Sequence, residues 1–350
     1  MKIGIQMLGM RGPQAVELAK QAEAANFDGL WLPGGGDNYI EAALLLNATS
    51  KIVVGTSITP ALHASPAFHA NIAKHLQDIS HGRFVLGFGS QTKGQVRAAL
   101  GFNPPKIAKM AREIIEVARG IMSGVQFEYD GEFQQRRGPI PRIRPSEYPS
   151  PPIYYSGVGP MNLRIAGQYT DGFLAHPIFS RKYMEEIVWP EIDKGLAKAG
   201  KTRADHEMIA MPMTLVVYDE SERPALMTAA KRNLANYYTT RAYGDYMDFN
   251  GWEKERKAIW EVAARVGGNP GQFDFQALED CVTDEMVHTV CLVGTPDEVR
   301  ATAKTRYAGV ADYLDFYPMQ YTGATPSQTA DNAFRNIQRI IETYGPLKSA

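Results

Sequence analysis

The residues that follow the apolar run 153–156 form the local pattern best suited to chemistry. They are Gly157, Val158, Gly159 and Pro160, and a helical pattern comes directly after them. Glycine lets the backbone approach an anion closely, and proline suits the first turn of a helix. The free amides of such a turn, together with the helix dipole, bind phosphate without a basic side chain. The pattern therefore predicts a phosphate site, with an ordinary glycine-rich turn as the alternative.

Two more strand ends carry small or hydroxyl-bearing residues. The segment 55–60 ends before a proline, and a bulge there would direct backbone atoms toward a ring bound nearby. The segment 87–92 leaves room for a large planar ligand and offers hydrogen-bonding groups. A plain turn and a loose, glycine-rich strand end are the alternatives. The candidate residues in these two segments are Ser57, Ile58, Gly87, Gly89, Ser90 and Gln91.

His176 is the candidate general acid, because it follows the run 172–175 and histidine changes its protonation near neutral pH. A purely structural histidine is the alternative. None of the seven histidines has the spacing of a zinc site, so we expect no metal. The GxSxG, P-loop and GxGxxG patterns are absent from the sequence, which disfavours a serine hydrolase, a P-loop nucleotide site and a Rossmann-type dinucleotide site.

These candidates need a scaffold that brings strand ends together. Eight short apolar runs alternate with helical patterns, which indicates a parallel sheet covered by helices. Eight strands favour a closed TIM-type (β/α)₈ barrel over an open sheet, and the chemistry of such a barrel lies at the carboxyl ends of its strands. The runs lie at 3–7, 27–32, 51–57, 83–88, 153–156, 172–175, 208–218 and 312–317.

We expect the barrel to form one domain over residues 1–350. Insertions are expected at about 125–151 and 240–288, and a C-terminal helix at 330–343. The first insertion contains a predicted hairpin that turns at Asp130-Gly131. An irregular aromatic stretch is predicted from residue 240 to about 280, and a short loop after the run 83–88.

Composition and charge exclude several classes of partner. A net charge of −1 creates no general attraction for nucleic acid or an anionic membrane. No uncharged apolar stretch reaches 18 residues. The two cysteines, Cys281 and Cys291, have no CxxC spacing, which is typical of a reduced, cytoplasmic protein. We therefore expect a small-molecule substrate as the partner.

An ordered series of motifs resembles the luciferase-like monooxygenase superfamily and, within it, the branch of F420-dependent oxidoreductases. Each motif is modest alone, but the series extends over nearly the whole chain, to about residue 317. The matching segments are FDGLW at 27–31, GTSIT at 55–59, SP at 65–66, GRFVLGFGSQ at 82–91, PPIYYSGVGP at 151–160, AGQYTDGF at 166–173, HP at 176–177, VGTPDEV at 293–299 and YAG at 307–309.

The resemblance implies a bacterial luciferase-like barrel, dimeric, with the ring of a flavin or deazaflavin across its mouth. The Ser57–Ile58 peptide then corresponds to a cis bond that supports the ring. The segment 157–160 matches the cofactor phosphate loop, and the segment 87–90 matches the loop beside the ring. Gln91 stands where the sugar-phosphate dehydrogenases of the family have a catalytic glutamate. Glucose 6-phosphate is therefore a poor substrate, and Gln91 becomes a candidate catalytic residue.

Three functions remain open at this point. The resemblance favours an oxidoreductase that transfers hydride between coenzyme F420 and a small organic substrate. The alternatives are an FMN-dependent monooxygenase and a barrel that binds its cofactor without catalysis. F420 carries an acidic tail, which arginines would suit if the first insertion covered the barrel mouth; a solvated surface loop is the alternative. These arginines are Arg136, Arg137, Arg142 and Arg144.

Overall fold

Eight parallel strands close into a barrel in the computed structural model, which describes residues 1–34, 38–139, 146–320 and 326–345. Each strand pairs with the next along the sequence, and the last pairs with the first, Ile5 lying opposite Phe316. The predicted TIM-type barrel is confirmed. In order, the strands are β1 (Lys2–Gln6), β2 (Gly29–Leu32), β3 (Val53–Thr56), β5 (Phe84–Gly89), β8 (Ile153–Ser156), β9 (Gly172–Leu174), β10 (Glu207–Ala210) and β13 (Tyr313–Pro318).

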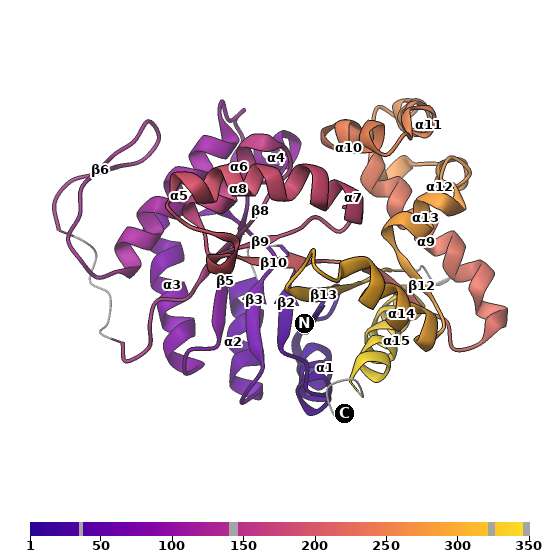
Figure 1. Cartoon of the computed structure of the whole chain (residues 1–350), viewed down its shortest axis with the longest axis horizontal. Coiled ribbons are helices and arrows are strands. Elements are labelled where there is room, and N and C mark those ends of the chain that lie inside the picture. Colours follow the sequence, from indigo (N-terminus) through magenta and orange to yellow (C-terminus); the bar gives the residue numbers. More distant parts are fainter. Residues whose placement is uncertain (35–37, 140–145, 321–325, 346–350) are drawn as a thin grey trace.

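Helices surround the strands and enclose the larger of two apolar cores (Figure 1). In α5 the residues at 111, 114, 115, 118, 121 and 122 are buried, a spacing that puts them on one face of the helix. The covering helices are α1 (Gly12–Ala24), α2 (Asn38–Ala48), α3 (Pro66–Ile79), α5 (Ile107–Met122), α6 (Pro160–Tyr169), α8 (Trp189–Lys198), α14 (Pro296–Tyr307) and α15 (Pro326–Tyr344). No helix in the described ranges is long and apolar enough to cross a membrane.

A second, smaller core fills the barrel interior. Trp31 stacks on Tyr154 with ring centroids 5.9 Å apart, and its indole N–H donates to the Tyr313 hydroxyl. Glycine makes room for these rings, because a Cβ at Gly55 would lie 2.4 Å from Trp31. The interior is therefore a packed core rather than a pore, and it separates the two ends of the barrel.

The run 208–218 is not one strand, as the sequence predicts, but two. The barrel strand β10 ends at Ala210, and β11 (Met213–Val216) pairs with the end of β13 and with β12 (Leu292–Gly294). The interruption falls at Pro212, which has no N–H to donate to the strand ladder. The barrel rim therefore lies at Met211 and not after Tyr218.

Two helical regions differ from the prediction. The stretch predicted to be irregular after residue 240 is helical, and its elements are short and separated by left-handed glycines at 251, 267 and 268, which weakens any periodic signal. The loop after β5 is not short, since it contains α4 (Lys93–Leu100), which begins with a capping box between Thr92 and Gln95. The other helices are α7 (Arg181–Tyr183), α9 (Arg223–Tyr238), α10 (Gly244–Phe249), α11 (Glu253–Ala264), α12 (Phe275–Glu279) and α13 (Asp284–Val290).

The predicted hairpin in the first insertion is confirmed as β6 (Tyr129–Asp130) and β7 (Gln135–Arg136). Its turn spans residues 131–134 and not Asp130-Gly131, since Asp130 pairs with Gln135 in the strand ladder. The Tyr129 hydroxyl donates to Glu116 on α5 at 2.7 Å, so the hairpin lies along the outer side of that helix. Figure 1 shows it extending beyond α5 at one edge of the molecule. The remaining strand, β4 (Thr59–Pro60), pairs with the end of β5.

Candidate active site

A cavity of about 300 Å³ lies at the carboxyl ends of the barrel strands. Residues at the ends of all eight barrel strands line it, and α4, α9 and the start of the region after residue 240 complete its wall. The predicted site residues on this wall are Ser57, Ile58, Gly89, Ser90, Gln91, Gly157, Val158 and His176. Gly87, Gly159 and Pro160 lie within one or two residues of these positions in the chain but do not line the cavity. The barrel thus brings together candidates that are up to 119 residues apart, from 57 to 176.

The described residues that line this cavity include no lysine, arginine, aspartate or glutamate. Its polar groups are amides, hydroxyls and the His176 ring. An unpaired charge is costly to hold in such a wall, because nothing of opposite sign compensates its loss of water. The cavity is therefore suited to neutral groups, and an anion would have to be held by backbone amides.

The Ser57–Ile58 peptide bond is cis, as the resemblance predicts. The Ile58 carbonyl accepts a hydrogen bond from the Asn38 side chain at 3.3 Å, and the Ser57 hydroxyl accepts one from Gln6 at 2.8 Å. A Cβ at Gly89 would lie 2.5 Å from Ile58. Helix α2 and strands β1 and β5 therefore position this segment against the cavity.

Replacing Gly89 by alanine is expected to weaken cofactor binding about tenfold. The added methyl group must displace the Ile58 side chain, since a separation of 2.5 Å is well inside van der Waals contact. Titration of the purified variant with cofactor, followed by fluorescence, measures the effect. A circular dichroism melt controls for folding, and an affinity equal to that of the parent protein would contradict the proposed place of Ile58 at the cofactor.

The loop after β8 has the conformation that the anion-site hypothesis requires. Gly159 precedes α6 with φ 84° and ψ 157°, and no side chain caps the amides of this helix. Asn162 holds the loop from inside: its amide donates to the Val158 carbonyl at 2.8 Å, and its oxygen accepts from the Tyr155 hydroxyl at 2.7 Å. The space beside Gly159 is open, with no atom within 4 Å of an added Cβ. Free first-turn amides beside open space fit a phosphate.

His176 lies on the cavity wall, but its surroundings do not suit a charged acid. Burial lowers the pKa of its imidazole to about 3, so the ring is neutral near pH 7. Its Nε2 lies 2.8 Å from the Tyr243 hydroxyl, and its ring packs against Tyr237 and Phe179. A neutral imidazole can orient a neighbour or relay a hydrogen bond, and it does not supply a proton as an imidazolium would.

Gln91 also lies on the wall and has a left-handed backbone with φ 58°. Its Oε1 is buried without a hydrogen-bond partner among the described residues. An unpaired buried amide oxygen is costly unless a ligand satisfies it. The position therefore fits a contact to a bound molecule.

Several cavity residues were not among the candidates from sequence. They are Gln6, Met211, Tyr237, Tyr243 and Tyr317. Tyr317 ends a predicted strand, so its place is a usable signal. The tyrosines at 237 and 243 belong to an aromatic stretch that the sequence allows to cap a substrate pocket, although packing under a loop or a dimer contact is the favoured interpretation from sequence. Their position on the cavity wall agrees with the cap. Beneath Gln6, the carboxyl group of Asp315 accepts a hydrogen bond from the Gln6 amide at 2.5 Å, and burial raises the pKa of Asp315 well above its usual range.

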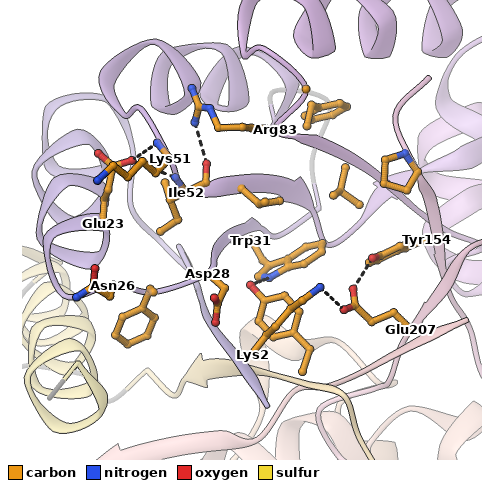
Figure 2. Close-up of a pocket in the computed structure, with 17 residues that line it drawn as sticks. Lys2, Glu23, Asn26, Asp28, Trp31, Lys51, Ile52, Arg83, Tyr154 and Glu207 are labelled. Carbon is orange, nitrogen blue, oxygen red and sulfur yellow. Dashed lines mark hydrogen bonds and ion pairs between the residues drawn. The ribbon is translucent and has the colours of Figure 1, made fainter. Parts of the chain in front are cut away.

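A larger hollow of about 720 Å³ opens at the opposite, amino-terminal end of the barrel (Figure 2). The charged side chains that line this hollow form ion pairs and hydrogen bonds with other groups of the protein. Lys2 pairs with Glu207 at 2.6 Å, Glu23 accepts from the Lys51 backbone amide at 2.6 Å, and Arg83 donates to the Ile52 carbonyl at 2.8 Å. Groups at this end of a TIM barrel usually serve stability. We therefore place the chemistry at the other end.

A model of the luciferase-like monooxygenase family matches residues 5–313. The chain belongs to the luciferase-like monooxygenase family. The expectation of a luciferase-like oxidoreductase is thereby confirmed. The 5,10-methylenetetrahydromethanopterin reductase of Archaeoglobus fulgidus is 29% identical over 303 residues, which cover 85% of this chain and 88% of the relative.

Two solved structures share the luciferase-like fold. The coenzyme F420-dependent tetrahydromethanopterin reductase from Methanopyrus kandleri superposes with a TM-score of 0.72 at 22% identity, covering 97% of this chain and 99% of that one. The oxygenating constituent of 3,6-diketocamphane monooxygenase from Pseudomonas putida, in complex with FMN, gives 0.66 at 18% identity, with coverages of 99% and 98%. An F420-dependent enzyme and an FMN-binding enzyme thus share this fold.

Proposed function

We propose that the protein is an F420-dependent oxidoreductase that acts on a small organic substrate. The observation that carries the proposal is one cavity that combines the Ser57–Ile58 segment, the segment 89–91 and the open amide turn after β8. The motif series and the F420-dependent fold relative support the choice of cofactor. When bound, the deazaflavin ring supplies or accepts a hydride.

The residues of this chain have separate tasks in the proposal. The amides from Gly157 to Pro160 would hold the cofactor phosphate, and Ile58 would support the ring. Gln91 would satisfy its free Oε1 with the ring or the substrate. The cavity wall would offer the substrate the hydroxyl groups of Tyr243 and Tyr317.

The prediction that arginines of the first insertion lie over the barrel mouth and bind the acidic F420 tail is wrong for the two of them that the structure describes. Arg136 lies on the outer side of α5, where it packs over the Phe127 ring and donates to the Pro139 carbonyl, and Arg137 lies beside Asp130. Neither lines the cavity. Arg142 and Arg144 lie outside the described residues. The hairpin follows α5 because Tyr129 and the backbone of residues 132–134 bind glutamates of that helix.

Helix α4 carries two exposed cations that lie closer in the chain to cavity residues than the hairpin arginines do. Its residue Gln95 lines the same cavity as Gly157, and Lys93 and Arg97 are exposed on the same helix, one turn apart. We propose that these two cations attract the carboxylates of the tail beyond the phosphate loop. FMN has no such tail, so this contact would separate the two cofactors.

F420 is expected to bind at least about tenfold more tightly than FMN, and this advantage should shrink at high salt because the tail contacts are ionic. Titrating the protein with each cofactor at two salt concentrations measures both effects. The double variant Lys93→Gln/Arg97→Gln should lose about three- to tenfold in F420 affinity and nothing in FMN affinity. Arg137→Gln on the outer hairpin is the matched control. Tight FMN binding without F420 binding would instead support the monooxygenase.

A further inference from the structure

The orientation of the Tyr243 hydroxyl in the cavity is set by its contact with His176. Tyr243 and His176, which are 67 residues apart in the chain, meet at 2.8 Å across the wall. In the neighbouring pair, the Tyr237 hydroxyl donates to the Tyr317 hydroxyl at 2.9 Å. In the first pair, a second contact favours one direction of the hydrogen bond.

That second contact is made by the backbone. The Ile178 amide N–H points at Nδ1 of His176 at 3.5 Å, which favours Nδ1 as the accepting nitrogen. Since the neutral ring carries one proton, that proton is on Nε2 and is donated to the Tyr243 oxygen. The phenolic hydrogen of Tyr243 then has no protein acceptor in this pair. It is free to be donated to a ligand in the cavity.

The charge of the cavity limits what that ligand can be. The described lining residues include no cation for an anionic substrate and no anion for a cationic one. Burial raises the pKa of the Tyr243 hydroxyl to about 12, so the phenol keeps its proton at neutral pH. A protonated donor in an uncharged wall recognises a neutral hydrogen-bond acceptor.

We infer that the enzyme reduces a neutral carbonyl compound whose oxygen accepts a hydrogen bond from Tyr243, with His176 positioning that hydroxyl. The inference rests on the proposed function. In the step, the carbonyl carbon receives a hydride from the reduced cofactor, and the π electron pair moves to the carbonyl oxygen. That oxygen takes the phenolic proton and becomes an alcohol. The N–H of His176 stabilises the phenolate that is left, which regains a proton from solvent because Tyr243 is only partly buried.

Equilibrium binding tests this inference without a measurement of turnover. The protein loaded with oxidised F420 cannot reduce a ketone, so binding of cyclohex-2-enone can be measured by calorimetry without turnover. Cyclohexanecarboxylate of similar size is the charged comparison. We expect the enone to bind at least about tenfold more tightly than the carboxylate. Tyr243→Phe should weaken enone binding about tenfold, the loss of one hydrogen bond, and leave F420 affinity within twofold.

Turnover variants test the positioning role of His176. Tyr243→Phe is expected to lower kcat for reduction of the enone carbonyl, measured as formation of cyclohex-2-enol, about 100-fold or more, in the range of a lost general acid. His176→Leu should lower kcat nearly as much, while His176→Gln, whose amide can still donate to Tyr243, should recover a substantial part. Tyr218→Phe removes a hydroxyl that bonds Glu342 outside the barrel and is the matched control.

The outcomes are separable. Absence of F420 binding to the parent protein would refute the proposed cofactor, and the same enone measurements on the FMN-loaded protein would then test Tyr243. In a protein that binds its cofactor, carboxylate binding as tight as enone binding would overturn the inference. So would full enone affinity and turnover in Tyr243→Phe. Equal losses in His176→Leu and His176→Gln would return His176 to a packing role.

Discussion

Replacing Gly159 by valine is expected to weaken binding of F420 or FMN by roughly 100-fold, with the barrel intact. The backbone of Gly159, at φ 84° and ψ 157°, lies in a region that side chains with a Cβ essentially do not adopt. No atom lies within 4 Å of an added Cβ, so the loss comes from the turn changing its conformation and not from a clash. Moving the amides from the phosphate removes charge-assisted hydrogen bonds worth about 2–3 kcal/mol together, or roughly 30- to 150-fold.

Fluorescence titration with each cofactor measures the effect, and both carry the ribityl phosphate. Gly200→Val is the matched control, because Gly200 also has a left-handed backbone, φ 67°, and open space at its Cβ, but it lies after α8, away from the cavity. The control should lose stability without losing affinity. Equal affinities in the parent and Gly159→Val proteins would remove the phosphate assignment.

Buried histidines are expected to make the fold sensitive to acid. Burial lowers the pKa of His69 to about 4, that of His176 to about 3 and that of His206 to about 4. A lowered pKa means that the folded state favours the neutral ring, while the unfolded chain takes up protons below about pH 6.5. The stabilisation is therefore complete above pH 6.5 and is lost as the pH falls toward 4. Asp315, whose pKa burial raises, contributes in the opposite direction.

The contribution of His69 to this acid sensitivity can be tested separately. It is 1% exposed on α3; its Nδ1 lies 2.8 Å from the Tyr39 hydroxyl, and its Nε2 lies 3.1 Å from the Ala61 carbonyl. A pKa lowered from 6.5 to about 4 contributes about 3 kcal/mol to the free energy of unfolding at neutral pH. This contribution is lost as the pH falls to about 4. His69→Gln keeps one donor and one acceptor but cannot titrate, so its stability should fall less steeply with acid.

Urea unfolding at pH 7.5, 6 and 5 measures the free energy of unfolding of both proteins. The slopes of this free energy against pH are compared, so a loss of stability of the variant at neutral pH does not affect the result. His75→Gln, at an exposed position of the same helix, is the control and should follow the parent protein. Parallel pH dependences for the parent and His69→Gln would show that His69 does not carry the effect.

The local sequence was sufficient for the barrel strands and for part of the site. Alternation of apolar runs with helical patterns gave the eight barrel strands, because strand and helix periodicities are properties of a few neighbouring residues. The turn after β8 could be interpreted in the same way, since the need for glycine at a left-handed position is local. The cis bond at Ser57–Ile58 came from the motif resemblance and not from the residues themselves.

Packing between distant segments decided the rest. Whether the arginine-rich hairpin covers the mouth depends on its contacts with glutamates of α5, and no periodic pattern reports such a contact. The pairing of Tyr243 with His176 likewise needs α9 and the barrel rim to be in place first. Sequence alone therefore determined the barrel, and it predicted the end of the barrel and the glycine turn at which we propose that the cofactor binds. The tertiary structure decided that His176 is neutral and which hydroxyl it orients, because burial and hydrogen-bond direction arise only when separate elements enclose a side chain.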